Sequence, residues 1–331
     1  MSAINTNFRH RHAAHCESGV AANLMTHHGV EMSEAMAFGL ASALSFAYLP
    51  FIKLTGFPLI AYRMPPRSIL KGMSRTFQTR FRFETFRAPE TGMRRLDELL
   101  EMGKVVGLQT SVFWLPYFPE DMRFHFNAHN LLVYGRAGDD YLISDPVAEE
   151  PQRCARADLQ RARFARGVLA PKGLLYYPDE LGTREITPPM VRKALVKTSR
   201  IMLGPVPIAG VRGMRMLARK VARLKADEAH SLDFVGHIVR MQEEIGTGGG
   251  GFRFLYAAFL QEAAALPGLA FLDGYAERFL ATGDAWRDFA LATARMVKGR
   301  DPMDPVQLAD HLFALADREA VLFRDLKQSL A

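Results

Sequence analysis

The hydrophobic periodicity of the chain changes near residue 181, and this change constrains the fold more than any other sequence feature. Before it, strand-like and helix-like segments are mixed, whereas from Ile186 onward the pattern is helical almost throughout. Turn-forming residues cluster between the mixed region and the helical region, in residues 178–189 (PDELGTREITPP). A chain of 331 residues is also long enough for two hydrophobic cores. We therefore predict an α+β domain over residues 1–180 and an all-α domain over residues 181–331.

The expected elements follow from the same periodicity. In the first domain we predict helices at 18–28 and 33–44 and strands at 79–86, 105–115, 131–134, 141–144 and 173–177. In the second domain we predict helices at 189–203, 208–225, 226–245, 252–265, 271–297 and 305–329. Residues 131–144 carry a hairpin signal at GRAGD, which predicts antiparallel pairing in the sheet.

Cysteine use and hydropathy limit the class of protein. Two cysteines, Cys16 and Cys154, exclude a disulfide framework and a metal site built from several cysteines. The first 25 residues lack the apolar run of a signal peptide, and no stretch approaches the length of a membrane span. We expect a soluble protein in a reducing, cytoplasmic setting.

Cys16 is the first candidate for chemistry, because it precedes a predicted helix. The N–H groups and the positive dipole end of a helix N-terminus stabilise a thiolate, and they also stabilise an oxyanion on a group bound to the sulfur. A lone cysteine is more often buried and inert, so position alone leaves that alternative open.

The hairpin supplies a partner for this cysteine. If the hairpin loop has three residues centred on Ala137, the residue numbers of two directly opposed positions add up to 274. His129 then lies directly opposite Asp145. An aspartate that orients a histidine next to a thiol is the arrangement of papain-like cysteine enzymes. The alternative is that His129 is a core histidine and that Asp145 only ends a strand.

Other residues compete for these roles. His125 could replace His129 as the base, but it lacks an evident carboxylate partner, and Cys154 has no base nearby. The histidines at positions 10, 12, 15, 27 and 28 lack the carboxylates of a metal site, so we predict no bound metal.

The glycine run GTGGGG (246–251) resembles an anion cradle because it opens a helix. Gly248, Gly249 and Arg253 would then close over a substrate. The glycine run lacks the spacing of a Walker phosphate-binding loop. The alternative interpretation is that it forms a flexible loop between two helices.

Charge is concentrated in the helical half. The net charge is +7, and residues 192–225 contain ten Lys or Arg and no Asp or Glu. The stretch predicts either a solvated surface or a docking site for an acidic carrier protein, a phosphopantetheine phosphate or an anionic membrane. Nucleic acid is excluded as the favoured partner, because aromatic stacking residues do not alternate with these charges.

Residues 15–48, which begin HCESGVAANLM and contain the segment AFGLASALSFAY, resemble the N-terminal domain of the butirosin biosynthesis protein H family. The resemblance continues through SVFWLPYFP (111–119) and NAHNLLVYGRAGDDYLISDP (127–146). EEIGTGGGGFRFLYAAFLQEAA (243–264) is similar to the helical domain of unassigned role that commonly follows it.

The resemblance implies a papain-like cysteine acyltransferase that moves an acyl group from an acyl carrier protein to a small-molecule amine. Cys16 would be acylated, His129 would act as base and acid, and Asp145 would orient His129. The related bacteriocin-processing peptidases usually carry a Gln a few residues before the cysteine as oxyanion donor, and here that region, residues 10–15, reads HRHAAH. The donor would instead be backbone, His15 or Gln109.

The sequence therefore predicts acyl transfer from a phosphopantetheine thioester, on a carrier protein or coenzyme A, with no bound cofactor. A thioesterase or amidase with the same Cys-His-Asp group is the second hypothesis. A non-catalytic module that binds a carrier protein or a membrane is the third, and a homodimer is a candidate assembly.

Overall fold

A computed structural model of the chain describes residues 4–5, 7–54, 56–245 and 249–330. The chain forms two compact units: unit 1 comprises residues 1–37 and 66–185, and unit 2 comprises residues 38–65 and 186–331. The predicted α+β class, with an antiparallel sheet followed by a helical region, is confirmed. The units differ from the predicted division in two respects: residues 38–65 belong to the helical unit, and the boundary lies after residue 185 and not after residue 180.

Unit 1 is built on an antiparallel sheet with the strand order β4-β9-β5-β6-β7-β8, and β1 pairs with β6. The strands are β1 (Ile4–Asn5), β4 (Arg80–Glu84), β5 (Val106–Thr110), β6 (His129–Ala137), β7 (Asp140–Ser144), β8 (Gln152–Ala155) and β9 (Leu175–Glu180). The predicted strands in this unit all form: β4 and β5 are shorter than predicted, and β6, β7 and β9 are longer. β5 ends at Thr110, which pairs with His129, the first residue of β6.

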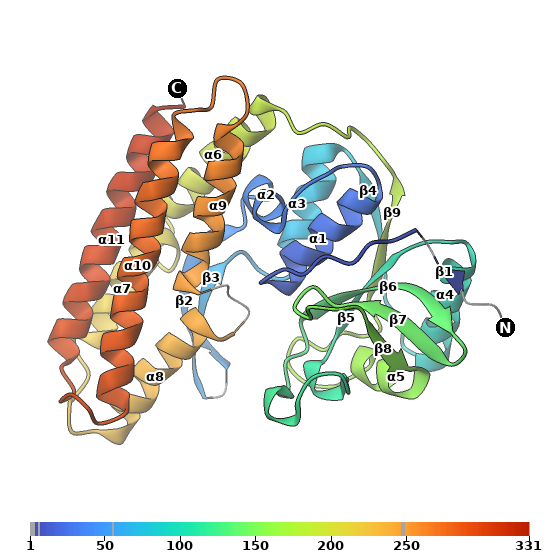
Figure 1. The fold of residues 1–331 in the computed structure, drawn as a ribbon. Helices are drawn as coiled ribbons and strands as arrows, with labels where there is room; N and C mark the ends of the chain where they lie inside the picture. Colours follow the sequence, from blue (N-terminus) through green and yellow to red (C-terminus); the bar gives the residue numbers. More distant parts are fainter. Residues whose placement is uncertain (1–3, 6, 55, 246–248, 331) are drawn as a thin grey trace. The chain divides into compact units, whose positions relative to one another are not determined.

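Helices cover both faces of this sheet (Figure 1). α1 (Cys16–His27) and α3 (Ser68–Phe77) lie on one side, and α4 (Pro89–Glu101) and α5 (Arg156–Arg163) lie on the other. Fully buried Leu96, Leu131 and Ile143 belong to the hydrophobic core between the sheet and the second pair of helices. The sheet is thus a fixed platform against which the N-terminal helix is held.

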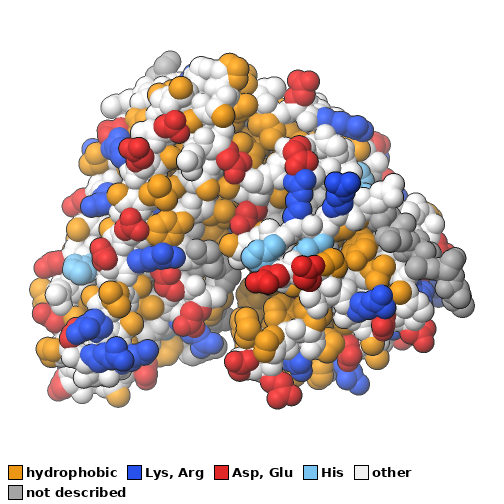
Figure 2. Space-filling model, in the orientation of Figure 1, with side chains coloured by type: hydrophobic (Ala, Val, Ile, Leu, Met, Phe, Trp, Pro, Cys, Tyr) orange, Lys and Arg blue, Asp and Glu red, His pale blue; other side chains and the backbone are white. Residues whose placement is uncertain are grey.

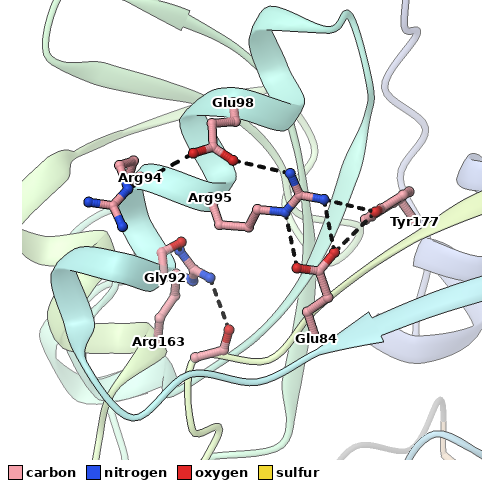
Figure 3. A network of polar contacts seen from close by, with 8 residues as sticks. Glu84, Gly92, Arg94, Arg95, Glu98, Arg163 and Tyr177 are labelled. Atoms are coloured by element: carbon pink, nitrogen blue, oxygen red, sulfur yellow. Dashed lines mark hydrogen bonds and ion pairs between the residues drawn. The ribbon is translucent and has the colours of Figure 1, made fainter.

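A network of ion pairs ties α4 to strands β4 and β9 (Figure 3). Arg95 lies between Glu84 and Glu98, with N–O distances of 3.0 and 3.1 Å, and the Tyr177 hydroxyl donates to Glu84. The buried Arg163 guanidinium donates to the carbonyl oxygen of Gly92 at 2.9 Å. These contacts join α4 to the sheet and to α5, so we assign them to the stability of unit 1.

Unit 2 joins a long hairpin to a set of helices. The hairpin is formed by β2 (Leu44–Leu54) and β3 (Phe57–Arg63), and α2 (Glu34–Leu40) spans the division between the units. The helices are α6 (Pro188–Leu203), α7 (Gly210–Val221), α8 (Ala229–Glu243), α9 (Arg253–Ala264), α10 (Leu272–Val297) and α11 (Pro305–Gln328). The six helices predicted here are confirmed. None of the described helices is long and apolar enough to cross a membrane.

The hairpin of unit 2 is absent from the sequence prediction, which continues a helix to residue 44. Residues 41–46 are all buried, so this part of the chain lacks the alternation of buried and exposed positions that marks a half-buried strand. A short apolar run cannot be assigned to helix or strand by periodicity alone. Burial against helices of the same unit decides the outcome, and that information is not local.

Candidate active site

Cys16 is the first residue of α1, as the sequence predicts a cysteine at a helix start. His15 is the N-cap residue, in extended conformation, and its Nδ1 accepts from the Ser18 backbone N–H at 3.2 Å. The Glu34 carboxylate accepts from the backbone N–H groups of Ala14 and His15 at 2.9 and 3.1 Å. These bonds fix the backbone that leads into Cys16, so the helix N-terminus is held in one orientation.

The packing beneath this helix start is tight. A Cβ atom at Gly19 would lie 2.5 Å from Cβ of Pro146 and 2.7 Å from Cβ of Ala13. The Ala13 backbone N–H also donates to the Pro146 carbonyl oxygen at 2.7 Å. Pro146 follows Asp145 in the chain, so the helix that carries the thiol packs directly on the segment that carries the carboxylate.

His129 and Asp145 form a buried pair. The distance from His129 Nε2 to Asp145 Oδ2 is 2.6 Å, and the two residues are 4% and 0% exposed. Asp145 Oδ2 also accepts from the Tyr117 hydroxyl at 2.7 Å, and its Oδ1 accepts from the Val147 backbone N–H at 3.2 Å. The carboxylate is therefore held by three donors, and through it the imidazole ring is held in place.

The charges in this group favour a protonated imidazole. Burial alone lowers the pKa of His129, but the charge and hydrogen bond of Asp145, together with the hydrogen bond and charge of Cys16, raise that pKa to about 10. Since Nε2 faces Asp145, Nδ1 is the ring nitrogen left to face the thiol. Cys16, which is 6% exposed, thus lies beside a histidine whose other nitrogen is fixed by an aspartate.

The predicted register of the hairpin is wrong, although the predicted pair forms. Ala137 pairs with Asp140, so the loop has two residues, and Gly138 takes a φ of 66° at its first position, where such loops favour glycine. A register shift between Val133 and Gly135 then changes by one residue which positions of β6 and β7 lie opposite each other. Asp145 therefore reaches His129 from beyond the end of β7 and not as its direct cross-strand partner.

Tyr117 is the site residue that the sequence analysis misses. It lies after β5, in the aromatic segment 111–119, and burial and the Asp145 charge raise the pKa of its hydroxyl well above the usual range. The phenol therefore stays protonated and donates to Asp145. No local pattern marks this tyrosine, because the contact joins residues 28 positions apart.

Gln109 is not placed to stabilise an oxyanion. Its Nε2 donates to the carbonyl oxygens of Asn127 and Leu169 at 2.9 and 3.0 Å, so both amide hydrogens are in use. The structure corrects this prediction. His15 is 1% exposed and caps α1, and its use as an oxyanion donor stays a prediction.

The glycine run does not form an open anion cradle in the residues described. Gly248 lies outside the described residues. Gly249 has a φ of 82°, and a Cβ there would approach Glu243 Oε2 at 3.2 Å. The next backbone N–H, of Gly250, donates to this same carboxylate at 3.1 and 3.2 Å. The chain's own Glu243 therefore occupies the position that we predicted for an external anion.

Arg253 is a structural residue of unit 2, and its predicted role as a substrate anchor is wrong. Its guanidinium is fully buried and forms a two-pronged ion pair with Glu319, with both N–O distances 2.9 Å. Nη1 donates to the Gly251 carbonyl oxygen at 2.6 Å, and Trp286 donates to Glu319 at 2.8 Å. These internal partners occupy each of its three nitrogens.

The competing candidates have other environments. His125 is exposed and stacks on Phe113, with ring centroids 4.1 Å apart. Cys154 is 1% exposed, and burial raises the pKa of its thiol to about 12, so it stays protonated. Among the described residues, no group of three or more His, Cys, Asp or Glu side chains could hold a metal ion.

Cys16, His129 and Asp145 all lie within a stretch of the chain that matches a known family model. Residues 15–146 match the family model described as butirosin biosynthesis protein H, N-terminal, and residues 157–326 match the model described as domain of unknown function (DUF4872). No curated protein matches the chain. Among solved structures, a Bacillus anthracis protein described as a C39-like peptidase matches 55% of this chain and 100% of its own, with 12% identity and a TM-score of 0.40.

Proposed function

Because the chain belongs to the family that joins a butirosin biosynthesis protein H N-terminal domain to a DUF4872 domain, we propose that it is a cysteine-dependent acyltransferase. The family match supports a cysteine enzyme of papain-like type. The proposal goes further: an acyl group passes from a phosphopantetheine thioester to Cys16, and from there to an amine or hydroxyl acceptor.

One observation carries the proposal. Cys16 begins a helix, beside a buried histidine that an aspartate holds at 2.6 Å. A thiol at a helix N-terminus with an oriented imidazole is the arrangement that generates a nucleophilic thiolate and moves a proton. The other cysteine of the chain, Cys154, is buried in β8, and burial raises the pKa of its thiol to about 12.

In the first step, the Cys16 thiolate attacks the thioester carbonyl carbon. The C–S bond to pantetheine breaks, and the departing pantetheine sulfur takes the proton from His129. The products are acyl-Cys16 and the free thiol of the donor. The exchange replaces one thioester with another, so the site needs a thiolate, an oriented acid and the exclusion of water.

In the second step, the acceptor amine attacks the acyl-Cys16 carbonyl carbon. Neutral His129 accepts a proton from the amine nitrogen, the C–S bond to Cys16 breaks, and the thiolate returns beside the imidazolium. Asp145 keeps the ring in one orientation through both steps and stabilises its charged form. We propose the backbone N–H of Cys16, the first residue of α1, as an oxyanion donor.

The donor is proposed to be carried by an acidic carrier protein, and α6 and α7 offer the docking surface. Lys193, Arg219, Lys220 and Arg223 are exposed on these two helices and on the residues that follow them. Arg215 is paired with Asp317 at 2.6 Å, so part of the charge of this stretch is already neutralised. The remaining positive charge suits the acidic surface of a carrier or its phosphate.

The mass of the intact protein after incubation with acyl-carrier and acyl-coenzyme A thioesters tests the proposal. We expect one acyl adduct on the wild type and on Cys154→Ala, and none on Cys16→Ala. Because Cys154→Ala removes the other thiol, it is the matched control. A folded wild-type protein that no thioester labels, or an adduct that persists in Cys16→Ala, would contradict acyl transfer through Cys16.

A further inference from the structure

Two loops of unit 1 surround the end of the sheet at which His129 and Asp145 lie. We call residues 111–126 and 164–170 the site-end loops. The first leaves β5 directly after Thr110, which pairs with His129, and the Ser111 backbone N–H donates to the Ala162 carbonyl oxygen at 2.9 Å. Both loops therefore belong to the neighbourhood of the catalytic histidine.

Buried amides fix the backbone of the second site-end loop. Asn127 Nδ2 donates to the carbonyl oxygens of Arg166 and Val168 at 3.2 and 2.9 Å, and Gln109 donates to that of Leu169 at 3.0 Å. Leu169 has a φ of 57°, in the left-handed region that is unfavourable for a residue with a side chain. Several hydrogen bonds thus maintain an unfavourable backbone next to the site.

This fixed backbone presents apolar side chains to solvent. Val168 and Leu169 are 69% and 50% exposed. In the first site-end loop, Trp114, Met122 and Phe124 are 37%, 54% and 41% exposed. The described part of unit 1 has eight exposed large hydrophobic side chains, and five of them lie in these two loops. The exposed apolar surface of unit 1 is therefore concentrated in the site-end loops. Hydrophobic side chains also gather on the face of unit 1 that Figure 2 shows.

A cavity of about 400 Å³ opens within the first site-end loop. Phe113, Trp114 and Pro116 supply its apolar walls, and α5 contributes Asp158 and Arg161. Its volume lies within the range of small-molecule sites, about 300–1,000 Å³.

The charged residues of this cavity do not suit an anion. Arg123 donates to the carbonyl oxygens of Phe118 and Pro116, at 2.7 and 2.8 Å, so its guanidinium is in use. Arg161 lies 3.6 Å from Asp158 and also over the Trp114 ring. With Glu120 as a further carboxylate, the lining favours an apolar ligand over a phosphate.

The wall of the cavity is continuous with the catalytic group. Tyr117 and Phe118 follow Pro116 directly, the first bonded to Asp145 and the second packed edge-on against His129 at 5.7 Å between ring centroids. The segment that lines the cavity therefore leads directly to the residues that contact the catalytic pair.

We propose that the cavity and the site-end loops bind the apolar acyl chain of the thioester donor, which makes the enzyme selective for hydrocarbon over polar aminoacyl groups. The inference rests on the proposed acyl transfer through Cys16. Walls of Phe113, Trp114 and Pro116, together with the exposed Val168 and Leu169, would shield the chain from water while the carbonyl carbon lies at the thiol.

A series of acyl-pantetheine thioesters tests the selectivity. The rate of Cys16 acylation is measured for acetyl, butyryl, hexanoyl and heptanoyl groups, and for 6-aminohexanoyl, in which an ammonium replaces the terminal methyl of heptanoyl. We expect an increase of about fourfold for each methylene buried, and much slower acylation by 6-aminohexanoyl. Trp114→Ser should reduce the heptanoyl-to-acetyl ratio, whereas the control Met102→Ser, at a position 65% exposed elsewhere in unit 1, should keep it.

Binding to Cys16→Ala separates this inference from the proposed function. Trp114 is one of the two tryptophans of the chain, so a fluorescence change that Trp114→Phe removes reports binding at the cavity. Tighter binding of heptanoyl-pantetheine than of its 6-aminohexanoyl counterpart supports the apolar site even if Cys16 is never acylated, a result that would defeat only the proposed function. Equal binding, or acylation rates independent of chain length, would overturn the inference.

Discussion

Replacement of Tyr117 by Phe removes one of the three donors that hold Asp145, and it removes little else. The hydroxyl lies 2.7 Å from Oδ2, the same oxygen that His129 contacts. A hydrogen bond to a charged group contributes about 1.5–3 kcal/mol. If the transition state loses the whole of this stabilising free energy, the acylation of Cys16 slows by about ten- to a hundredfold.

Tyr141→Phe is the matched control for this change. Its hydroxyl also donates to an aspartate oxygen at 2.7 Å, that of Asp97, in the same unit. Tyr117→Phe should lose about 1.5–3 kcal/mol of the free energy of unfolding, and Tyr141→Phe at least as much, because the Tyr141 hydroxyl also accepts from Arg156 Nη1 at 2.8 Å. Only Tyr117→Phe should slow the chemistry, because only its aspartate orients a catalytic group.

The assay is the single-turnover rate of Cys16 acylation, with the rate of Cys16 alkylation by iodoacetamide as a second readout. Cys154 does not interfere, since its buried thiol has a pKa of about 12 and stays protonated at neutral pH. Denaturant unfolding gives the stability of each variant. If Tyr117→Phe and Tyr141→Phe acylate at the same rate, Tyr117 does not position the catalytic carboxylate.

Three further changes test other parts of the structure. Gly19→Ala forces a Cβ to within 2.5 Å of Pro146 and should lower the free energy of unfolding by about 1–3 kcal/mol, whereas Gly236→Ala, with 3.6 Å to its nearest neighbour, should not; urea titration measures both. Burial, followed by the charges of neighbouring bases, lowers the pKa of His28 from 6.5 to about 4, so the unfolded chain takes up the proton first as pH falls, and stability is lost between about pH 6.5 and 4. His28→Asn should remove that part of the acid sensitivity, and an unchanged pH profile of unfolding would refute the reasoning. Arg253→Gln leaves a buried carboxylate without its partner and should cost about 3–5 kcal/mol in thermal or denaturant unfolding, and a loss below about 1 kcal/mol would contradict a buried ion pair.

The helices of unit 2 and the strands of unit 1 are readable from the sequence because their periodicity is local. α10 is predicted at 271–297 and forms at Leu272–Val297, since its apolar stripe repeats over many turns. The cysteine at a helix start is visible for the same reason: one residue and the pattern that follows it suffice.

The details of the site depend on contacts that no local pattern specifies. His129 and Asp145 meet although the predicted register is wrong, because the aspartate lies beyond the strand end and is held there by Tyr117 and Val147. Arg253 beside a glycine run has the pattern of an anion site, yet a carboxylate on α11 already neutralises it. A sequence shows that a group is charged, but it does not show which distant residue meets that charge.

The most direct test of acyl transfer follows the acyl group after it reaches Cys16. Acyl-enzyme is isolated free of donor thioester and mixed with a panel of amines or with buffer alone, and the released products are identified by mass. The account predicts that the adduct maps to the peptide containing Cys16 and that an amine converts it to an amide faster than water converts it to the free acid. Release of the free acid alone with every amine, or an adduct mapped to another residue, would contradict it.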